Sequence, residues 1–173
     1  MKTIDLKEHI RDIPDFPKEG IIFKDISTLL KHKDAFAHSI DLLAKQFQNE
    51  RVDYVVGVEA RGFIFGSALA YKLGTGFIPV RKKGKLPYKT KSVTYALEYG
   101  SDTLEIHEDA VPAGSRVLVV DDLLATGGTV KAVIDLLKAQ KAHIVSVAFI
   151  VELQFLKGKE KLQDLPVFSI IQY

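Results

Sequence analysis

Hydrophobic residues change their spacing from segment to segment along the chain, and the changes predict alternating strands and helices. Residues 54–58 form a short, continuous, β-branched run, which is typical of a strand covered on both faces. Similar runs predict strands over residues 77–80, 117–120 and 144–151. Apolar positions at helical spacing predict one helix over residues 63–73, ending at Gly74, and another over residues 130–140 with an apolar face of Val130, Val133, Ile134 and Leu137.

The N-terminal third has a different pattern, which predicts two helices and a connector. Leu6, Ile10 and Ile13 are spaced like one face of a short helix, which the prolines at 14 and 17 would end. Residues 20–27 follow as a connector with an apolar centre. A second helix is expected to begin at Asp34 as its N-cap, with an apolar face made of Phe36, Ile40, Leu43, Ala44 and Phe47.

Strands that alternate with helices predict an α/β fold with a parallel sheet. Right-handed crossovers between the strands would place helices on both faces of that sheet. Ligands of such sheets bind at the carboxyl ends of the strands. Two predicted strands end in polar, glycine-containing segments, at residues 59–62 and 121–129, and these segments are the first candidates for a binding site.

The stretch from Lys82 to Asp109 breaks this rhythm and predicts a β-hairpin. Apolar or aromatic residues alternate with others at 93, 95, 97 and 99, a turn signal follows at 100–102, and the alternation resumes at Leu104 and Ile106. Long excursions of this kind are typical of lids, so we expect a flexible lid over about residues 82–109. The rest is expected to form a single domain over 1–173, with a small hood made mainly of residues 1–27 and the C-terminus as a further candidate part of it.

Composition limits the alternatives. The chain has 173 residues, which suits one domain, and a formal net charge of only +2, without the overall basic character of nucleic-acid binders. It has no cysteine, which excludes disulfides and thiol catalysis. No apolar run has the length of a signal peptide or a membrane span, so we expect a cytoplasmic protein without a membrane partner. The five histidines lack metal-ligand spacing.

The segment from residue 121 to 129 combines two features that together suit a phosphorylated ribose. Gly127 and Gly128 let the backbone approach an anion, and the N–H groups and dipole of the following helix favour negative charge. Thr126 and Thr129 add hydroxyl donors. Asp121 and Asp122 would repel a phosphate directly but accept hydrogen bonds from the hydroxyls of an attached ribose.

Other phosphate motifs do not fit this chain. An isolated Gly-Gly-Thr would indicate an ordinary strand-to-helix turn with a capping threonine, but the thirteen residues from 117 to 129 form a more specific string. A P-loop requires Gly-x-x-x-x-Gly-Lys-Ser/Thr, which is absent from the sequence. The Gly74-Thr75-Gly76 string precedes a strand and lacks the third glycine of a dinucleotide fingerprint.

The string from 121 to 129 resembles the phosphoribosyl pyrophosphate motif of the type I phosphoribosyltransferases. Other strings, spread in order over nearly the whole chain, resemble the adenine-specific branch of that family. They are Asp15-Phe16-Pro17, Gly20-Ile21-Ile22-Phe23-Lys24-Asp25-Ile26-Ser27, Glu59-Ala60-Arg61-Gly62-Phe63, Arg81-Lys82-Lys83-Gly84-Lys85-Leu86-Pro87, Leu97-Glu98-Tyr99-Gly100 and Val151-Glu152-Leu153.

The resemblance implies transfer of the phosphoribosyl group from phosphoribosyl pyrophosphate to adenine, giving AMP and pyrophosphate. It implies Mg²⁺ as cofactor, held mainly through the substrate and not by a protein metal site. It also implies a homodimer, in which Arg81 reaches the neighbouring subunit's site. The residues expected to bind phosphoribosyl pyrophosphate are Glu59, Ala60, Arg61, Arg81, Lys82, Lys85, Asp121, Asp122, Ala125, Thr126, Gly127, Gly128 and Thr129.

Catalysis and base recognition are expected from other segments. Arg61 would stabilise the pyrophosphate leaving group, in a turn whose family counterpart has an unusual peptide geometry. Glu98 would handle the proton on the adenine ring, and Tyr99 would cover the site. Ile22, Phe23 and Lys24 would form the adenine pocket: Phe23 stacks on the purine, and backbone groups read its edge and reject a 6-oxo group. Many relatives have Arg at position 24.

Two other functions share part of this pattern. An enzyme for another purine would have the same residues 117–129 and differ in the hood. A phosphoribosyl pyrophosphate sensor that regulates transcription would need a DNA-binding module, for which the chain has no spare residues, and would not need Arg61 or Glu98.

Overall fold

The computed structural model describes residues 4–96, 100–162 and 165–173. The chain divides into two compact units, residues 1–42 and residues 43–173, and each is described by itself. The first contains short elements and the start of α2 (Lys33–Phe47), and the second contains the main sheet.

A short antiparallel hairpin is the main feature of the first unit. A 3₁₀ turn, η1 (Leu6–His9), leads into β1 (Arg11–Pro14), which pairs with β2 (Ile22–Asp25). Cross-strand charge pairs join the two strands, with Lys24 Nζ 2.7 Å from Asp12 Oδ1 and a second pair between Arg11 and Asp25. The chain then forms α1 (Ser27–Lys31) and enters α2.

Three predictions for this unit were wrong. The expected helical face continued to Ile13, but the helix ends at His9 and Ile10 is already extended, because residues 11–14 pair with a strand far along the chain. The expected connector is partly that partner strand, β2. The N-cap of α2 is His32, whose Nδ1 accepts a hydrogen bond from the Ala35 N–H at 3.2 Å, while Asp34 lies in the first turn.

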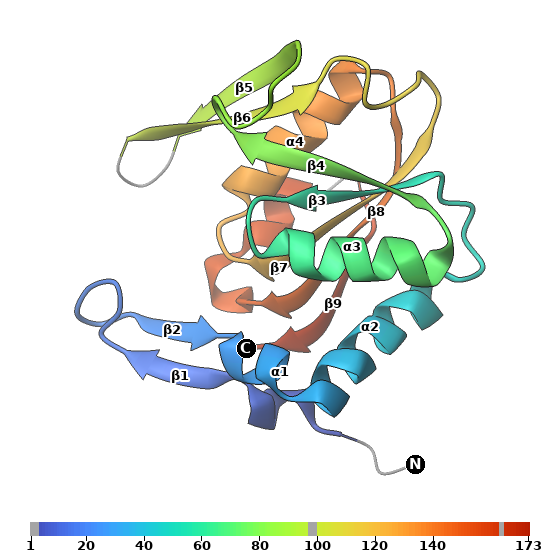
Figure 1. Ribbon diagram of the computed structural model, residues 1–173. Helices are drawn as coiled ribbons and strands as arrows, with labels where there is room; N and C mark the ends of the chain where they lie inside the picture. The colour runs from blue at the N-terminus through green and yellow to red at the C-terminus, as the bar shows by residue number, and fades with distance from the viewer. Residues whose placement is uncertain (1–3, 97–99, 163–164) are drawn as a thin grey trace. The chain divides into compact units, whose positions relative to one another are not determined.

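The second unit is built on a seven-stranded sheet of order β5-β6-β4-β3-β7-β8-β9 (Figure 1). Strands β3 (Tyr54–Val58), β4 (Gly76–Lys82), β7 (Arg116–Leu124), β8 (His143–Glu152) and β9 (Val167–Gln172) are parallel to one another. The four predicted strands and the two predicted helices, α3 (Gly62–Leu73) and α4 (Gly128–Ala139), are confirmed. Gly74 ends α3 in the left-handed conformation, as expected.

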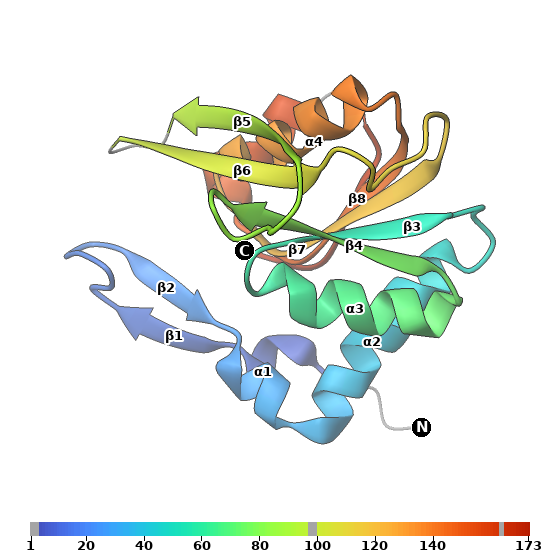
Figure 2. The ribbon, with the colours of Figure 1, turned by 45° about the horizontal axis from the view of Figure 1, so that its top comes forward.

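Helices cover both faces of the sheet, with α3 on one side and α4 on the other (Figures 1 and 2). On the α4 side, Val56, Val119 and Val147 are buried in one cluster with Val133 and Leu137. On the α3 side the approach is closer: a Cβ on Gly57 or Gly66 would lie within 3 Å of the Phe77 ring. Alternate residues of each central strand are therefore buried against different helices, which explains their uninterrupted hydrophobicity.

The predicted hairpin exists and consists of β5 (Thr90–Ala96) and β6 (Ser101–His107). Its pairing with the rest of the sheet involves Arg81 with Glu105 and Lys82 with Leu104. The hairpin thus pairs with β4 through residues within β6 and projects beyond β4 (Figure 1).

The C-terminal residues belong to the main sheet. They form β9, which pairs in parallel with β8 and was not predicted. Two 3₁₀ turns, η2 (Gln154–Leu156) and η3 (Gly158–Leu162), connect β8 to it. The C-terminus, expected as a candidate part of the hood, thus forms the edge strand of the sheet next to β8.

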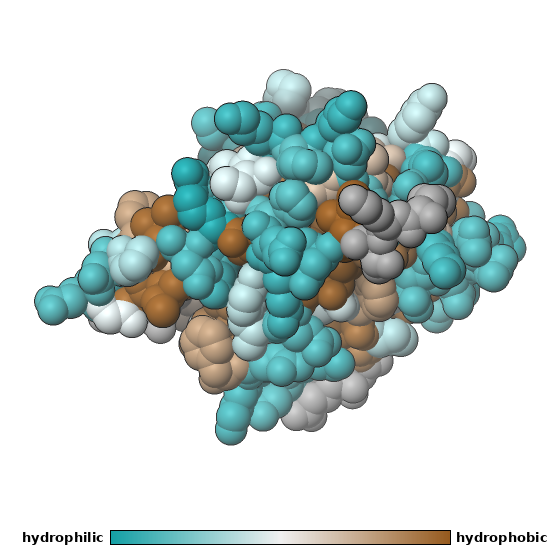
Figure 3. Space-filling view, turned by 90° about the horizontal axis from the view of Figure 1, so that it is seen from below, coloured by the Kyte–Doolittle hydropathy of each residue, from teal (hydrophilic) through white to brown (hydrophobic). Residues whose placement is uncertain are grey.

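The space-filling view of one face shows brown patches between larger hydrophilic regions (Figure 3). Large exposed apolar side chains occur on several elements, for example Tyr71 on α3 and Phe155 on η2. Among the residues described, no helix is long and apolar enough to cross a membrane.

Candidate active site

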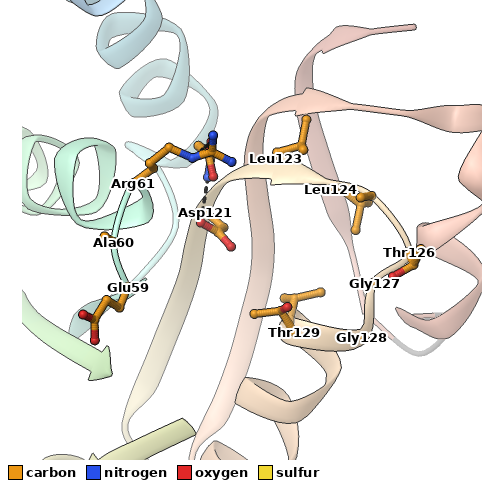
Figure 4. A pocket seen from close by; sticks show the side chains of 13 residues that line it. Glu59, Ala60, Arg61, Asp121, Leu123, Leu124, Thr126, Gly127, Gly128 and Thr129 are labelled. Carbon is orange, nitrogen blue, oxygen red and sulfur yellow. Dashed lines mark hydrogen bonds and ion pairs between the residues drawn. The ribbon is translucent and has the colours of Figure 1, made fainter. Parts of the chain in front are cut away.

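A cavity of about 260 Å³ lies at the carboxyl ends of β3 and β7, which are neighbours in the sheet. Two segments line it: the turn from β3 into α3, and the end of β7 with the start of α4 (Figure 4). The lining residues are Glu59, Ala60, Arg61, Asp121, Asp122, Leu123, Leu124, Ala125, Thr126, Gly127, Gly128, Thr129 and Val130. The structure thus brings together both segments that the sequence singles out.

The β7 strand is longer than predicted. It continues to Leu124, because Asp121, Leu123 and Leu124 keep their pairing with β8. The expected loop from 121 to 129 is therefore a strand end with two carboxylates, followed by a short connection to α4 at Gly128. The carboxylates are held on a rigid strand rather than on a loop.

The start of α4 suits an anion. Gly127 precedes the helix with φ of 78°, the left-handed region that favours glycine. Because glycine has no side chain to accept hydrogen bonds from the first helical turn, those N–H groups remain for water or an anion. Thr129 also lines the cavity, and its side chain extends into it (Figure 4).

A glycine from the C-terminal part of the chain supports this connection. A Cβ on Gly127 would lie 2.5 Å from the Gly158 carbonyl oxygen, and a Cβ on Gly158 would overlap the carbonyl oxygen of Ala125. Backbone therefore packs directly on backbone here. Glycine at both positions allows the two segments to approach this closely.

Arg61 extends from the β3–α3 turn toward the end of β7 (Figure 4). Its Nε lies 2.7 Å from Asp122 Oδ2; the Asp122 side chain is 6% exposed and that of Arg61 is 42% exposed. The guanidinium therefore pairs with a buried carboxylate while part of it stays accessible. The peptide bond between Glu59 and Ala60 is cis, which confirms the expected unusual geometry of this turn.

The two adjacent carboxylates are hard to ionise together. Burial raises the pKa of Asp121 well above its ordinary value, and the neighbouring charge of Asp122 adds to the effect. Burial also raises the pKa of Asp122, while Arg61 acts in the opposite direction. Space around them is tight, since a Cβ on Gly62 would lie 2.7 Å from Asp121 Oδ1. A ligand that donates hydrogen bonds would compensate this charge.

Glu59 is held by hydrogen bonds from Arg81 and from the backbone of Lys82. Its carboxylate accepts hydrogen bonds from the Lys82 N–H at 2.8 Å and from Arg81 Nε and Nη2 at 3.3 Å each. Burial opposes its ionisation, but these hydrogen bonds outweigh burial and lower the pKa of Glu59. Figure 4 shows the Glu59 side chain directed away from Arg61.

Three of the four basic residues predicted for phosphoribosyl pyrophosphate, Arg81, Lys82 and Lys85, lie outside the cavity lining, whereas Arg61 is part of it. Arg81 contacts Glu59 and also donates to the Lys85 carbonyl at 3.2 Å. Lys82 pairs with Asp102 on the hairpin, Nζ to Oδ2 3.1 Å, and this hydrogen bond raises the pKa of Lys82. Lys85 is exposed.

The residues predicted for base recognition are not among those that line the cavity. Ile22, Phe23 and Lys24 lie on β2 in the first unit, where Phe23 makes an edge-to-face contact with Phe16, with 5.2 Å between the ring centroids. Glu98 and Tyr99 lie outside the described residues.

Sequence reasoning did not single out four residues that contribute to this region. Leu123 and Leu124 line the cavity because β7 is longer than its apolar run suggested. Tyr95 Oη of the hairpin lies 3.3 Å from Thr129 Oγ1. Gly158 packs on the backbone before α4. The alternating pattern around Tyr95 could have marked it, whereas a single glycine at 158 carries no local signal.

Comparisons with known proteins agree with this geometry. The phosphoribosyl transferase domain family matches residues 25–171. The adenine phosphoribosyltransferase of Brachyspira hyodysenteriae is 56% identical over 98% of this chain and 100% of its own length. That of Syntrophotalea carbinolica is 60% identical over 98% of this chain and 99% of its own length.

Solved structures lead to the same family. The crystal structure of the adenine phosphoribosyltransferase from Thermoanaerobacter pseudethanolicus superposes with a TM-score of 0.94 at 52% identity, covering 97% of this chain and 98% of that one. The enzyme from Saccharomyces cerevisiae, solved with an imino-altritol bisphosphate and adenine, has a TM-score of 0.90 at 45% identity, covering 95% and 96%. The chain belongs to the phosphoribosyl transferase family and, within it, to the adenine phosphoribosyltransferases.

Proposed function

We propose that this protein salvages adenine, transferring the 5-phosphoribosyl group of phosphoribosyl pyrophosphate to the base and releasing AMP and pyrophosphate. The observation that carries the proposal is the cavity at the end of β7, where two strand-end carboxylates stand beside a glycine-rich helix start. These features suit the two halves of a ribose 5-phosphate.

In this proposal the phosphate of the ribose binds at residues 125–129. The N–H groups of the first turn of α4 and the hydroxyls of Thr126 and Thr129 donate to it. Asp121 and Asp122 accept hydrogen bonds from the ribose hydroxyls. The support is their position on the lining of one cavity.

Arg61 is proposed to stabilise the leaving pyrophosphate. The bond from C1′ to the pyrophosphate oxygen breaks with its electron pair on that oxygen, so negative charge grows on the leaving group. A guanidinium that is already positioned by a buried carboxylate meets that charge without reorganising. Lys82 and Lys85 are proposed to add mobile positive charge, and Arg81 to act at a neighbouring subunit's site in a homodimer.

Mg²⁺ is proposed as the cofactor, held mainly through oxygens of phosphoribosyl pyrophosphate. Oxygen is the ligand type that Mg²⁺ prefers, and the carboxylates of Asp121 and Asp122 fit a site in which substrate oxygens complete the set. When bound, Mg²⁺ neutralises charge on the pyrophosphate. Within the described residues, no group of three or more His, Cys, Asp or Glu side chains could hold a metal ion.

Base recognition is proposed for Ile22, Phe23 and Lys24, and proton transfer for Glu98. As N9 of adenine bonds to C1′, the ring must lose one proton, from N9 or, in the other tautomer, from N7, and a carboxylate can accept it. A backbone carbonyl that accepts from the 6-amino group would reject hypoxanthine and guanine, which present an acceptor there. We also propose a cytoplasmic location.

Pyrophosphate release tests the proposal. The purified protein is mixed with phosphoribosyl pyrophosphate, Mg²⁺ and one purine at a time, with chelator added in a parallel series. We expect rapid release with adenine, little with hypoxanthine or guanine, and none with chelator. Faster pyrophosphate release with a 6-oxopurine would show that adenine is not the preferred substrate. No pyrophosphate release with any base would contradict the proposal that the protein is an enzyme.

A further inference from the structure

The hairpin contacts the start of α4 through Tyr95 and the backbone of Ala96. Tyr95 lies near the end of β5, its Oη 3.3 Å from Thr129 Oγ1 in the second position of α4. Other atoms of the hairpin also approach the helix start: a Cβ on Gly128 would lie 3.8 Å from the Ala96 carbonyl oxygen and 3.9 Å from the Tyr95 ring. Tyr95 thus packs along the helix start, and its ring is half-buried against the core.

In the structure the Thr129 hydroxyl donates to Tyr95 Oη, and a bound anion would reverse the direction of this hydrogen bond. Each hydroxyl has one proton and two acceptor lone pairs. The oxygens of a bound phosphate dianion only accept, so Thr129 must donate its proton to the phosphate. Tyr95 then has to donate to Thr129 Oγ1, which gives a chain from phenol to threonine to phosphate in which each hydrogen bond polarises the next.

We propose that Tyr95 is a positioning residue for the 5′-phosphate: its hydroxyl orients the Thr129 hydroxyl toward the phosphate and ties β5 to the occupied loop. This inference rests on the proposed function and adds to it a residue that does not line the cavity. The present distance exceeds the usual O–H···O separation of about 2.7–2.8 Å, which leaves room for the bond to shorten when the phosphate binds.

The test uses Tyr95→Phe, which removes one oxygen and keeps the ring that packs on α4. We expect the dissociation constant for AMP, measured by calorimetry, to rise about three- to tenfold, the effect of one hydrogen bond. The KM for phosphoribosyl pyrophosphate should rise by the same factor, because both ligands carry the 5′-phosphate. The KM for adenine, which has no phosphate, should stay within about twofold.

A double-mutant cycle shows whether Tyr95 acts through Thr129. Thr129→Val alone should weaken AMP binding, and Tyr95→Phe added to it should have no further effect, since the partner of the phenol is already gone. The matched control is Thr94→Val, which breaks the hydroxyl pair between Thr94 and Thr103 (2.9 Å) on the same hairpin. That variant should bind AMP like the wild type.

While the wild type is active, the inference would be overturned by unchanged AMP binding in Tyr95→Phe, by independent effects of the two substitutions, or by equal losses for Thr94→Val. A change in the KM for adenine as large as that for phosphoribosyl pyrophosphate would also overturn it, since it would indicate a general disturbance. A wild type that neither binds AMP nor releases pyrophosphate would contradict the proposed function itself.

Discussion

Replacing Gly158 by alanine should disturb the phosphate-binding connection from outside the cavity. The added Cβ would overlap the Ala125 carbonyl oxygen and would lie 3.0 Å from the Gly127 amide nitrogen. Both neighbours are backbone atoms, so no side-chain rotation can relieve the overlap. Either the connection before α4 or the segment at η3 must move.

The size of the effect follows from the overlap. Overpacking at a rigid contact costs about 1–3 kcal/mol. For a chain of this length, 1 kcal/mol lowers the melting temperature by about 2–4 °C, so a loss of roughly 2–12 °C is expected. Binding should suffer as well, because a shift of about 0.5 Å in positioned groups is enough to weaken a site. We therefore expect a higher KM for phosphoribosyl pyrophosphate and an unchanged KM for adenine.

Thermal unfolding and initial-rate kinetics of Gly158→Ala test this reasoning. Lys157→Gly is the control at the neighbouring position: Lys157 has φ of 52°, which glycine adopts easily, so this change should cost less than about 1 kcal/mol. If Gly158→Ala melts with the wild type and keeps its KM for phosphoribosyl pyrophosphate, the close packing of Gly158 on residues 125–127 does not position the loop.

Three further substitutions test the charges of the site. Burial raises the pKa of Asp121, so the stability that this carboxyl contributes is present below its ordinary pKa of 3.8 and is lost as pH rises through the raised pKa. Asp121→Asn should remove that loss. The variant should therefore melt at a higher temperature than the wild type at pH 7, while it binds phosphoribosyl pyrophosphate less well. A lower melting temperature at pH 7 would contradict this. Glu59 has a lowered pKa, so its effect on stability depends on pH in the opposite direction: the stabilisation is present above pH 4.5 and is lost as pH falls through the lowered pKa. Glu59→Gln should therefore lower the free energy of unfolding by about 1–2 kcal/mol at pH 7. It should also weaken the fall of the melting temperature at acid pH. Equal pH profiles for variant and wild type would remove Glu59 from this network. Glu98→Gln should reduce kcat by orders of magnitude with little change in affinity for phosphoribosyl pyrophosphate, and near wild-type turnover would exclude Glu98 from proton transfer.

The main sheet was predictable because its signals are local. Each of β3, β4, β7 and β8 contains a run of apolar residues that are largely buried, so their burial is visible in the sequence itself. The β9 strand escaped prediction because an edge strand is buried less completely: Val167 to Ile170 are half-buried and only Ile171 is fully covered.

The hairpin of the first unit shows the limit of spacing rules. Leu6, Ile10 and Ile13 are separated by four and three residues, which matches a helical face. What decides the structure is pairing with residues a dozen positions away, such as Asp12 with Lys24. Such a pair has no periodic signature, so the helix was predicted where a strand forms.

In the candidate site, too, residues that are contiguous in the sequence were predictable and residues that act through distant contacts were not. Asp121, Asp122 and residues 125–129 are contiguous, so one strand, one connection and one helix start hold them together, and the sequence reveals them as a unit. Tyr95 and Gly158 lie about thirty residues before and after this segment. Tyr95 contacts it through one hydroxyl, and Gly158 packs on it because it lacks a Cβ. A contact made by so few atoms leaves no pattern along the chain. Residues of this kind are therefore found from the structure, and they are the ones whose substitution separates phosphate binding from recognition of the base.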